Sequence, residues 1–93
     1  MKRVFNNNIY ATQIRTTDNK KLDLLAEDDG HVIEQHPAGR WLTVTGDAEG
    51  NDIVTIEDAK ARAAFHRKLY VDVGQVVEVR IVLVSNNYKV VKE

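Results

Sequence analysis

The side chains that could carry acid–base or metal chemistry do not form a recognisable set in this 93-residue chain. His31 and His36 are separated by an odd number of positions, which places two strand residues on opposite faces. His66 has no partner at the His-Glu-x-x-His spacing of helical zinc sites. Ser85 has none of the glycines that form a nucleophile elbow, and there is no cysteine. We therefore predict no catalytic residue, no metal site and no cofactor, and a function other than catalysis.

Three places in the chain set an aromatic ring beside or close to a cation. Proteins that bind single-stranded nucleic acids stack bases on such rings and meet the phosphates with the cations. The net charge of −1 is unlike the basic excess of most nucleic-acid-binding proteins, so this function is the alternative and not the first choice. The residues that would form the nucleic-acid surface are Arg40, Trp41, Lys68, Tyr88 and Lys89.

Carboxylates gather in the polar stretch 46–52, which contains Asp47, Glu49 and Asp52. A second acidic group stands at 27–29. If these two loops lie side by side, they present a negative surface, and complementary charge guides association with a basic partner. We therefore predict that Asp47, Glu49 and Asp52 contact a protein partner.

A helix is expected at about 56–70. Thr55 is a suitable N-cap and Asp58 completes the capping pattern, while Arg67 and Lys68 would lie in the last turn. At about 100° per residue the helix has two apolar sides. The side with larger residues is expected to face the sheet, namely Ala61, Ala64, Phe65 and Leu69. The other side holds Ile56, Ala59, Ala63 and Tyr70, and either lies partly buried under loops or binds another chain through Ala59, Ala63 and Tyr70.

The most apolar and β-branched window is 76–84, which is too short to cross a membrane as a helix and fits a central strand. One face would be wholly apolar, through Val77, Val79, Ile81 and Leu83, and would pack on Phe65 and Leu69. The other face is mixed. Further strands are expected at 9–15, 21–27, 31–36, 40–45, 53–54 and 88–91, with turns at 17–20, 28–30 and 86–87.

Turn signals at intervals of about ten residues favour an antiparallel meander. The expected fold class is α+β, with a small antiparallel β-sheet or an OB-like barrel of five to six strands. One helix would precede a C-terminal β-hairpin. The order of elements resembles that of OB-folds, many of which carry a helix between the third and fourth strands. An open sheet with the helix on one face is the other arrangement.

Length and composition predict a single domain over residues 1–93, because domains typically hold about 100–150 residues. With 43% hydrophobic and 29% charged residues, the chain resembles neither disordered nor membrane proteins. The basic N-terminus lacks the apolar run of a secretory signal, so we expect a cytoplasmic protein. The sequence thus favours a small non-enzymatic binding or regulatory module that acts through a protein partner. A homodimer is one form that this module could take.

Overall fold

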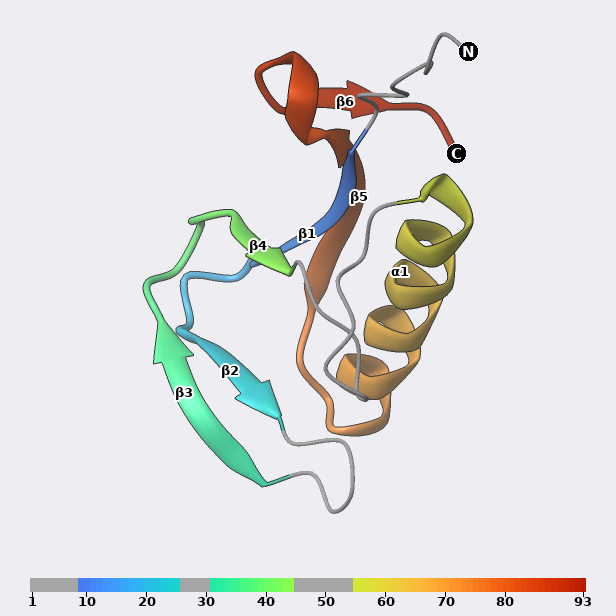
Figure 1. Cartoon of the computed structure of the whole chain (residues 1–93). Coiled ribbons are helices and arrows are strands. Elements are labelled where there is room, and N and C mark those ends of the chain that lie inside the picture. The colour runs from blue at the N-terminus through green and yellow to red at the C-terminus, as the bar shows by residue number, and fades with distance from the viewer. Residues whose placement is uncertain (1–8, 26–30, 45–54) are drawn as a thin grey trace, which may run out of the picture.

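The computed structural model of the protein describes residues 9–25, 31–44 and 55–93. In these residues one α-helix and six β-strands make an α+β fold, as the sequence predicts (Figure 1). The elements in chain order are β1 (Tyr10–Thr16), β2 (Leu22–Leu25), β3 (Val32–His36), β4 (Leu42–Val44), α1 (Ile56–Asp72), β5 (Val77–Leu83), the 3₁₀-helix η1 (Val84–Asn86) and β6 (Lys89–Val91).

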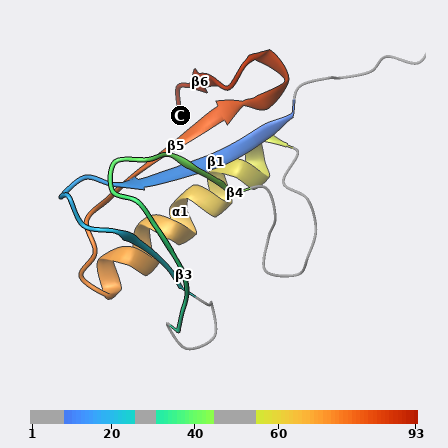
Figure 2. The ribbon, with the colours of Figure 1, turned by 90° about the vertical axis from the view of Figure 1, so that its left-hand side faces the viewer.

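Four strands form an antiparallel sheet in the order β4-β1-β5-β6, while β2 and β3 form a separate antiparallel pair. The C-terminal hairpin is β5–β6, as predicted. Helix α1 covers one face of the larger sheet and packs on β1 and β5 (Figure 2). No pairing among the described strands joins β4 to β6, so these strands form a sheet with a helix on one face and not a closed OB-like barrel.

The expected meander is wrong, because β1 does not pair with β2, its neighbour in the sequence. It lies instead between β4 and β5. Asn19 does make the expected turn after β1, with a φ of 66°. A turn shows where the chain reverses but not whether the flanking strands pair. Strand β1 is buried along most of its length, and a buried strand needs a neighbour on each side to bond its backbone.

The central pair β1–β5 divides its side chains between the two faces of the sheet. Tyr10, Thr12 and Ile14 share the helix-facing side of β1, and Ile81 packs with the helix from β5. On the mixed face of β5, Val82 is also fully buried, where it lies opposite Ala11 of β1 and Val90 of β6 in the strand register.

Helix α1 begins as predicted. Thr55 has extended backbone angles, and its hydroxyl accepts a hydrogen bond of 3.1 Å from the Asp58 N–H, which satisfies one of the free donors of the first turn. The helix ends at Asp72, two residues later than expected. Arg67 and Lys68 consequently lie before the last turn, and the prediction that they complement its dipole is wrong.

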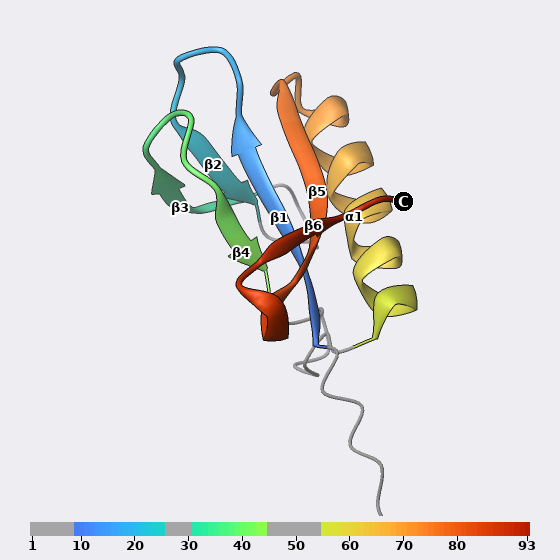
Figure 3. The same cartoon turned by 90° about the horizontal axis from the view of Figure 1, so that it is seen from above.

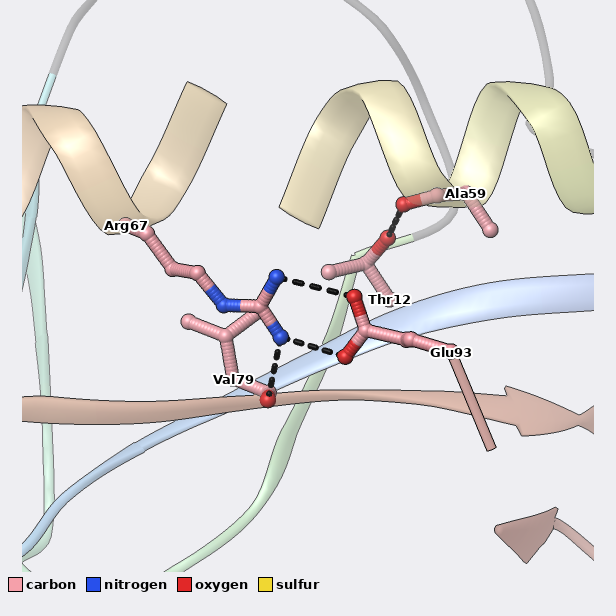
Figure 4. Close-up of polar contacts among 5 residues, drawn as sticks. All are labelled: Thr12, Ala59, Arg67, Val79 and Glu93. Atoms are coloured by element: carbon pink, nitrogen blue, oxygen red, sulfur yellow. Dashed lines mark hydrogen bonds and ion pairs between the residues drawn. The ribbon is translucent and has the colours of Figure 1, made fainter. Parts of the chain in front are cut away.

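The prediction of which side of α1 faces the sheet is also wrong. Ala59, Ala63, His66 and Tyr70 are buried, whereas Ala61 and Ala64 are exposed. The reason is the close approach that alanines allow. The Thr12 hydroxyl donates a hydrogen bond of 2.8 Å to the Ala59 carbonyl oxygen, across the contact between strand and helix (Figure 4). Phe65 and Leu69 are too large for this contact and are half-buried at its flank.

The turn between β5 and β6 differs from the expected two-residue turn at Asn86-Asn87. The chain first makes η1, and then Asn87 and Tyr88 take positive φ values of 52° and 60°. Asparagine tolerates this conformation, but an aromatic residue rarely adopts it. A tyrosine at position 88 therefore gives no indication in the sequence that the turn extends to it.

In the view of Figure 3 the β2–β3 pair lies to the left of β1, and α1 lies to the right of β5. Leu22 anchors it to the core, where it packs with Ile14 and Tyr70. The side chain of Gln75, which follows α1, bonds to the backbone of the pair. Its Nε2 donates to the Lys21 carbonyl (2.8 Å) and its Oε1 accepts from the Asp23 N–H (3.3 Å). The predicted turn at 28–30 and the predicted strand at 53–54 lie outside the described residues.

Candidate binding surfaces

Three of the predicted partner-binding residues, Asp47, Glu49 and Asp52, lie outside the described residues. Ala59, Ala63 and Tyr70 have no exposed area, because they pack in the core beneath the helix. The proposed contact of these three residues with another chain is therefore corrected: they hold α1 on its own sheet.

The outer face of the sheet, opposite α1, carries a cluster that we call the Trp41 cluster: Trp41, Arg15 and Arg80. The guanidinium carbon of Arg80 lies 3.8 Å from the centre of the Trp41 ring, and that of Arg15 lies 4.5 Å from it. Trp41 is half-buried. Strand β1 supplies one arginine and β5 the other, and Trp41 comes just before β4, so three neighbouring strands build the cluster.

Hydrogen bonds fix the arginines of the Trp41 cluster. Arg80 Nε donates to Gln13 Oε1 (2.8 Å), and Gln13 Nε2 donates to the Thr43 hydroxyl (3.0 Å). Arg15 pairs with Glu78 at 2.6 Å. Partial burial, with the neighbouring Arg15 cation, lowers the pKa of Arg80 from its ordinary value. Two cations thus share one nearby carboxylate, and the cluster carries a positive excess.

A polar hollow of about 200 Å³ adjoins the Trp41 cluster, and Arg15 and Glu78 form part of its wall. Its other lining residues come from the turn after β1 and from the segment before Trp41, namely Thr16, Thr17, Asn19, Ala38 and Gly39. The outer face therefore offers an aromatic ring, two guanidinium groups and a small polar hollow side by side.

The other residues predicted for nucleic-acid binding do not join this cluster. Lys68 lies on α1, on the other side of the sheet, where its Nζ pairs with Asp72 at 3.0 Å. Tyr88 and Lys89 are exposed at the β5–β6 turn. Arg40 is exposed next to Trp41 in the chain. Arg15 and Arg80 could not be predicted for this cluster, because their meeting depends on the register that sets Gln13 opposite Arg80 across 67 positions.

A second surface surrounds the end of α1, and we call it the valine groove. Its exposed valines are Val71 (72% exposed) and Val76 (58%). A hollow of about 320 Å³ lies between the last turns of α1 and the start of β5. The residues that line it are Arg67, Val71, Gly74, Gln75, Val76 and Val77.

Arg67 closes one end of the valine groove. Its guanidinium binds both carboxylate oxygens of Glu93 and donates a hydrogen bond of 3.1 Å to the Val79 carbonyl (Figure 4). This hydrogen-bonded pairing lowers the pKa of the Glu93 carboxyl and raises that of Arg67. Because the cation is neutralised within the chain, the groove presents a mainly apolar surface.

The histidines do not meet one another as a metal site. His36 lies 3.4 Å from the Glu34 carboxylate, His31 is exposed, and His66 packs against the rings of Phe65 and Tyr70 under α1. Within the part of the chain that the structure describes, no group of three or more His, Asp or Glu side chains could hold a metal ion. No helix in the same part is long and apolar enough to cross a membrane.

No protein-family model, no curated protein and no solved structure matches the chain.

Proposed function

We propose that this chain is a small, non-enzymatic, cytoplasmic binding and regulatory module that docks a protein partner on the valine groove. The observation that carries the proposal is the exposure of two valines, Val71 and Val76, around one hollow. Single exposed apolar residues are ordinary, but a contiguous apolar patch with polar residues at its rim marks a contact surface.

A site-specific photo-crosslinker tests this proposal in the native host. Benzoylphenylalanine in place of Val71 should give a covalent adduct with one protein species. The same residue in place of Ala61, which is exposed on another side of α1, is the matched control and should not. If the adduct is a dimer of this chain, sedimentation of the unmodified protein should show the same dimer. Equal adducts from both positions, or none from Val71, would contradict the proposal.

The partner identified in this way allows a binding measurement. We expect Val71→Asp to weaken the complex at least tenfold, because it places a charge in an apolar contact, where truncating a central anchor typically costs about 2 kcal/mol or more. Ala61→Asp should leave the affinity within a factor of two. Isothermal titration calorimetry with both variants makes the comparison, and equal losses would place the contact elsewhere.

The Trp41 cluster favours a second function, the binding of single-stranded nucleic acid. An aromatic ring with two adjacent guanidinium groups and a positive excess on an open sheet face is the combination that stacks bases and holds phosphates. Trp41 is the only tryptophan, so its fluorescence reports on this surface alone.

A titration with oligothymidylate at low salt tests this second function. Bound bases should quench the Trp41 fluorescence, and the affinity should fall with added salt by a log–log slope of about −0.7 for each phosphate contacted. Arg15→Ala with Arg80→Ala should weaken binding at least tenfold, whereas Lys68→Ala, on the opposite side of the sheet, should not. A fluorescence unchanged by the oligonucleotide at low salt would end this candidate.

A further inference from the structure

We propose that Arg80 is the binding site for one phosphate group and that Gln13 is the residue that positions it. This inference rests on the second function proposed above, the binding of single-stranded nucleic acid by the Trp41 cluster. It assigns different roles to the two arginines of the cluster: Arg80 contacts the ligand, whereas Arg15 is already engaged within the chain.

The two arginines differ in the groups that they bond. Nε and Nη2 of Arg15 both approach Oε1 of Glu78, at 2.7 and 2.6 Å, so its charge is neutralised by a neighbouring carboxylate. Among the described residues, no Asp or Glu carboxylate pairs with Arg80. The positive excess of the Trp41 cluster therefore lies on Arg80.

Gln13 fixes the guanidinium of Arg80 from below. Its side chain is only 6% exposed, and the strand register sets it between Thr43 of β4 and Arg80 of β5. Because Nε of Arg80 can only donate, the amide oxygen of Gln13 must face it, and the amide nitrogen is left to donate to the Thr43 hydroxyl. Three strands thus orient one guanidinium before any ligand arrives, which reduces the cost of ordering it on binding.

The bonds that hold Arg80 leave its outer edge available. Gln13 takes Nε, and the guanidinium carbon lies 3.8 Å from the centre of the Trp41 ring. Nη1 and Nη2 have no hydrogen-bond partner among the described residues. Partial burial and the Arg15 cation lower the pKa of Arg80, which means that both disfavour its charged form, and a bound anion would favour it.

A phosphate group fits this edge. The N–H groups of a guanidinium form a rigid planar fork that can hold two phosphate oxygens at once. The Trp41 ring lies against the same guanidinium, so a base next to the bound phosphate has an aromatic surface within reach. The Glu78 carboxylate beside Arg15 would repel a second phosphate there, so we assign one phosphate contact to the whole cluster.

The salt dependence of oligothymidylate binding counts this contact, with fluorescence anisotropy of a labelled oligonucleotide as the readout. Arg80→Ala should weaken binding at low salt at least tenfold and reduce the log–log slope by about 0.7, the value for one phosphate of a single strand. The matched control is Arg15→Ala with Glu78→Ala, which removes a cation together with its carboxylate and should keep the slope of the parent protein. A slope that is unchanged in Arg80→Ala, or reduced equally in both variants, would overturn the assignment to Arg80 while the nucleic-acid function stands.

A double-mutant cycle tests the positioning role of Gln13. Gln13→Met keeps the length of the side chain but removes the acceptor for Arg80, and it should weaken binding at least threefold in the parent protein. In the Arg80→Ala protein the same substitution should have no further effect, because there is no guanidinium left to position. An equal loss in both backgrounds would mean that Gln13 only supports the sheet, and would overturn this role.

Inorganic phosphate separates the site from the function on which it rests. In NMR spectra of the parent protein, millimolar phosphate should shift the Arg80 Nε–H signal, and chloride at the same ionic strength should not. A shift with phosphate but no binding of oligothymidylate would uphold the Arg80 site for a free phosphate group and overturn the nucleic-acid function. The absence of a response to both ligands would overturn the site itself.

Discussion

Replacing Tyr70 with alanine should lower the free energy of unfolding by about 3–5 kcal/mol, the cost of removing a large aromatic side chain from a core. Tyr70 has no exposed area and packs with Ile14 of β1 and Leu22 of β2, so one side chain joins the helix to both sheets. A loss of this size is a large part of the 5–15 kcal/mol that typically stabilises a domain. Urea denaturation followed by far-ultraviolet circular dichroism measures it.

Tyr70→Phe is the matched control, because it keeps the ring and should change the stability by no more than about 1 kcal/mol.

The native protein and Tyr70→Phe should differ in their free energy of unfolding at high pH. Burial raises the pKa of the Tyr70 phenol above its ordinary value of 10.0. The neutral phenol therefore stabilises the folded protein fully below pH 10. This contribution to the free energy of unfolding is lost as the pH rises through the folded pKa, because the phenol ionises first in the unfolded chain. The native protein should therefore lose more stability above pH 10 than Tyr70→Phe. A loss below 1 kcal/mol for Tyr70→Ala would contradict its place in the core.

The second large effect concerns the side of α1 that meets the sheet. Ala63→Leu should destabilise the protein by about 1–3 kcal/mol, because extra methylene groups in a closely packed contact displace the helix. Ala63 has no exposed area and packs against Ile81. The neighbouring Ala64 is exposed, so Ala64→Leu should change the stability by less than about 0.5 kcal/mol.

Thermal and urea denaturation of this pair decide between the two sides of the helix. A greater loss for Ala64→Leu than for Ala63→Leu would restore the orientation expected from the sizes of the side chains. Equal small losses would mean that the contact between helix and sheet is looser than the 2.8 Å bond between Thr12 and Ala59 indicates.

The features that the sequence predicts correctly are those that depend on neighbouring residues. The start of α1 follows from Thr55, whose hydroxyl accepts a hydrogen bond from the Asp58 N–H within one turn. The strand face of Tyr10, Thr12 and Ile14 follows from the two-residue period. The C-terminal hairpin follows from the short distance between two apolar runs. Each of these is decided within a few positions of the chain.

The errors concern contacts between distant residues. The side of α1 depends on how closely β1 can approach, and that depends on a bond between Thr12 and Ala59 that no local pattern contains. The Trp41 cluster depends on the pairing of β1 with β4 and β5, which a meander would not produce. For the candidate sites, the sequence indicated Trp41 but neither of its arginines. The valine groove was not predicted because Val71 and Val76 look like parts of an irregular connection until α1 is seen to extend to Asp72.

The side-chain amide of Gln75 couples the valine groove to the β2–β3 pair. It holds the backbone of Lys21 and Asp23 through both of its polar atoms, and the same residue lines the valine groove. Any occupant that displaces this side chain must break the bonds that steady β2, the strand that pairs with β3. By thermodynamic reciprocity, whatever engages the β2–β3 pair and shifts these bonds alters the affinity of the groove by the same factor.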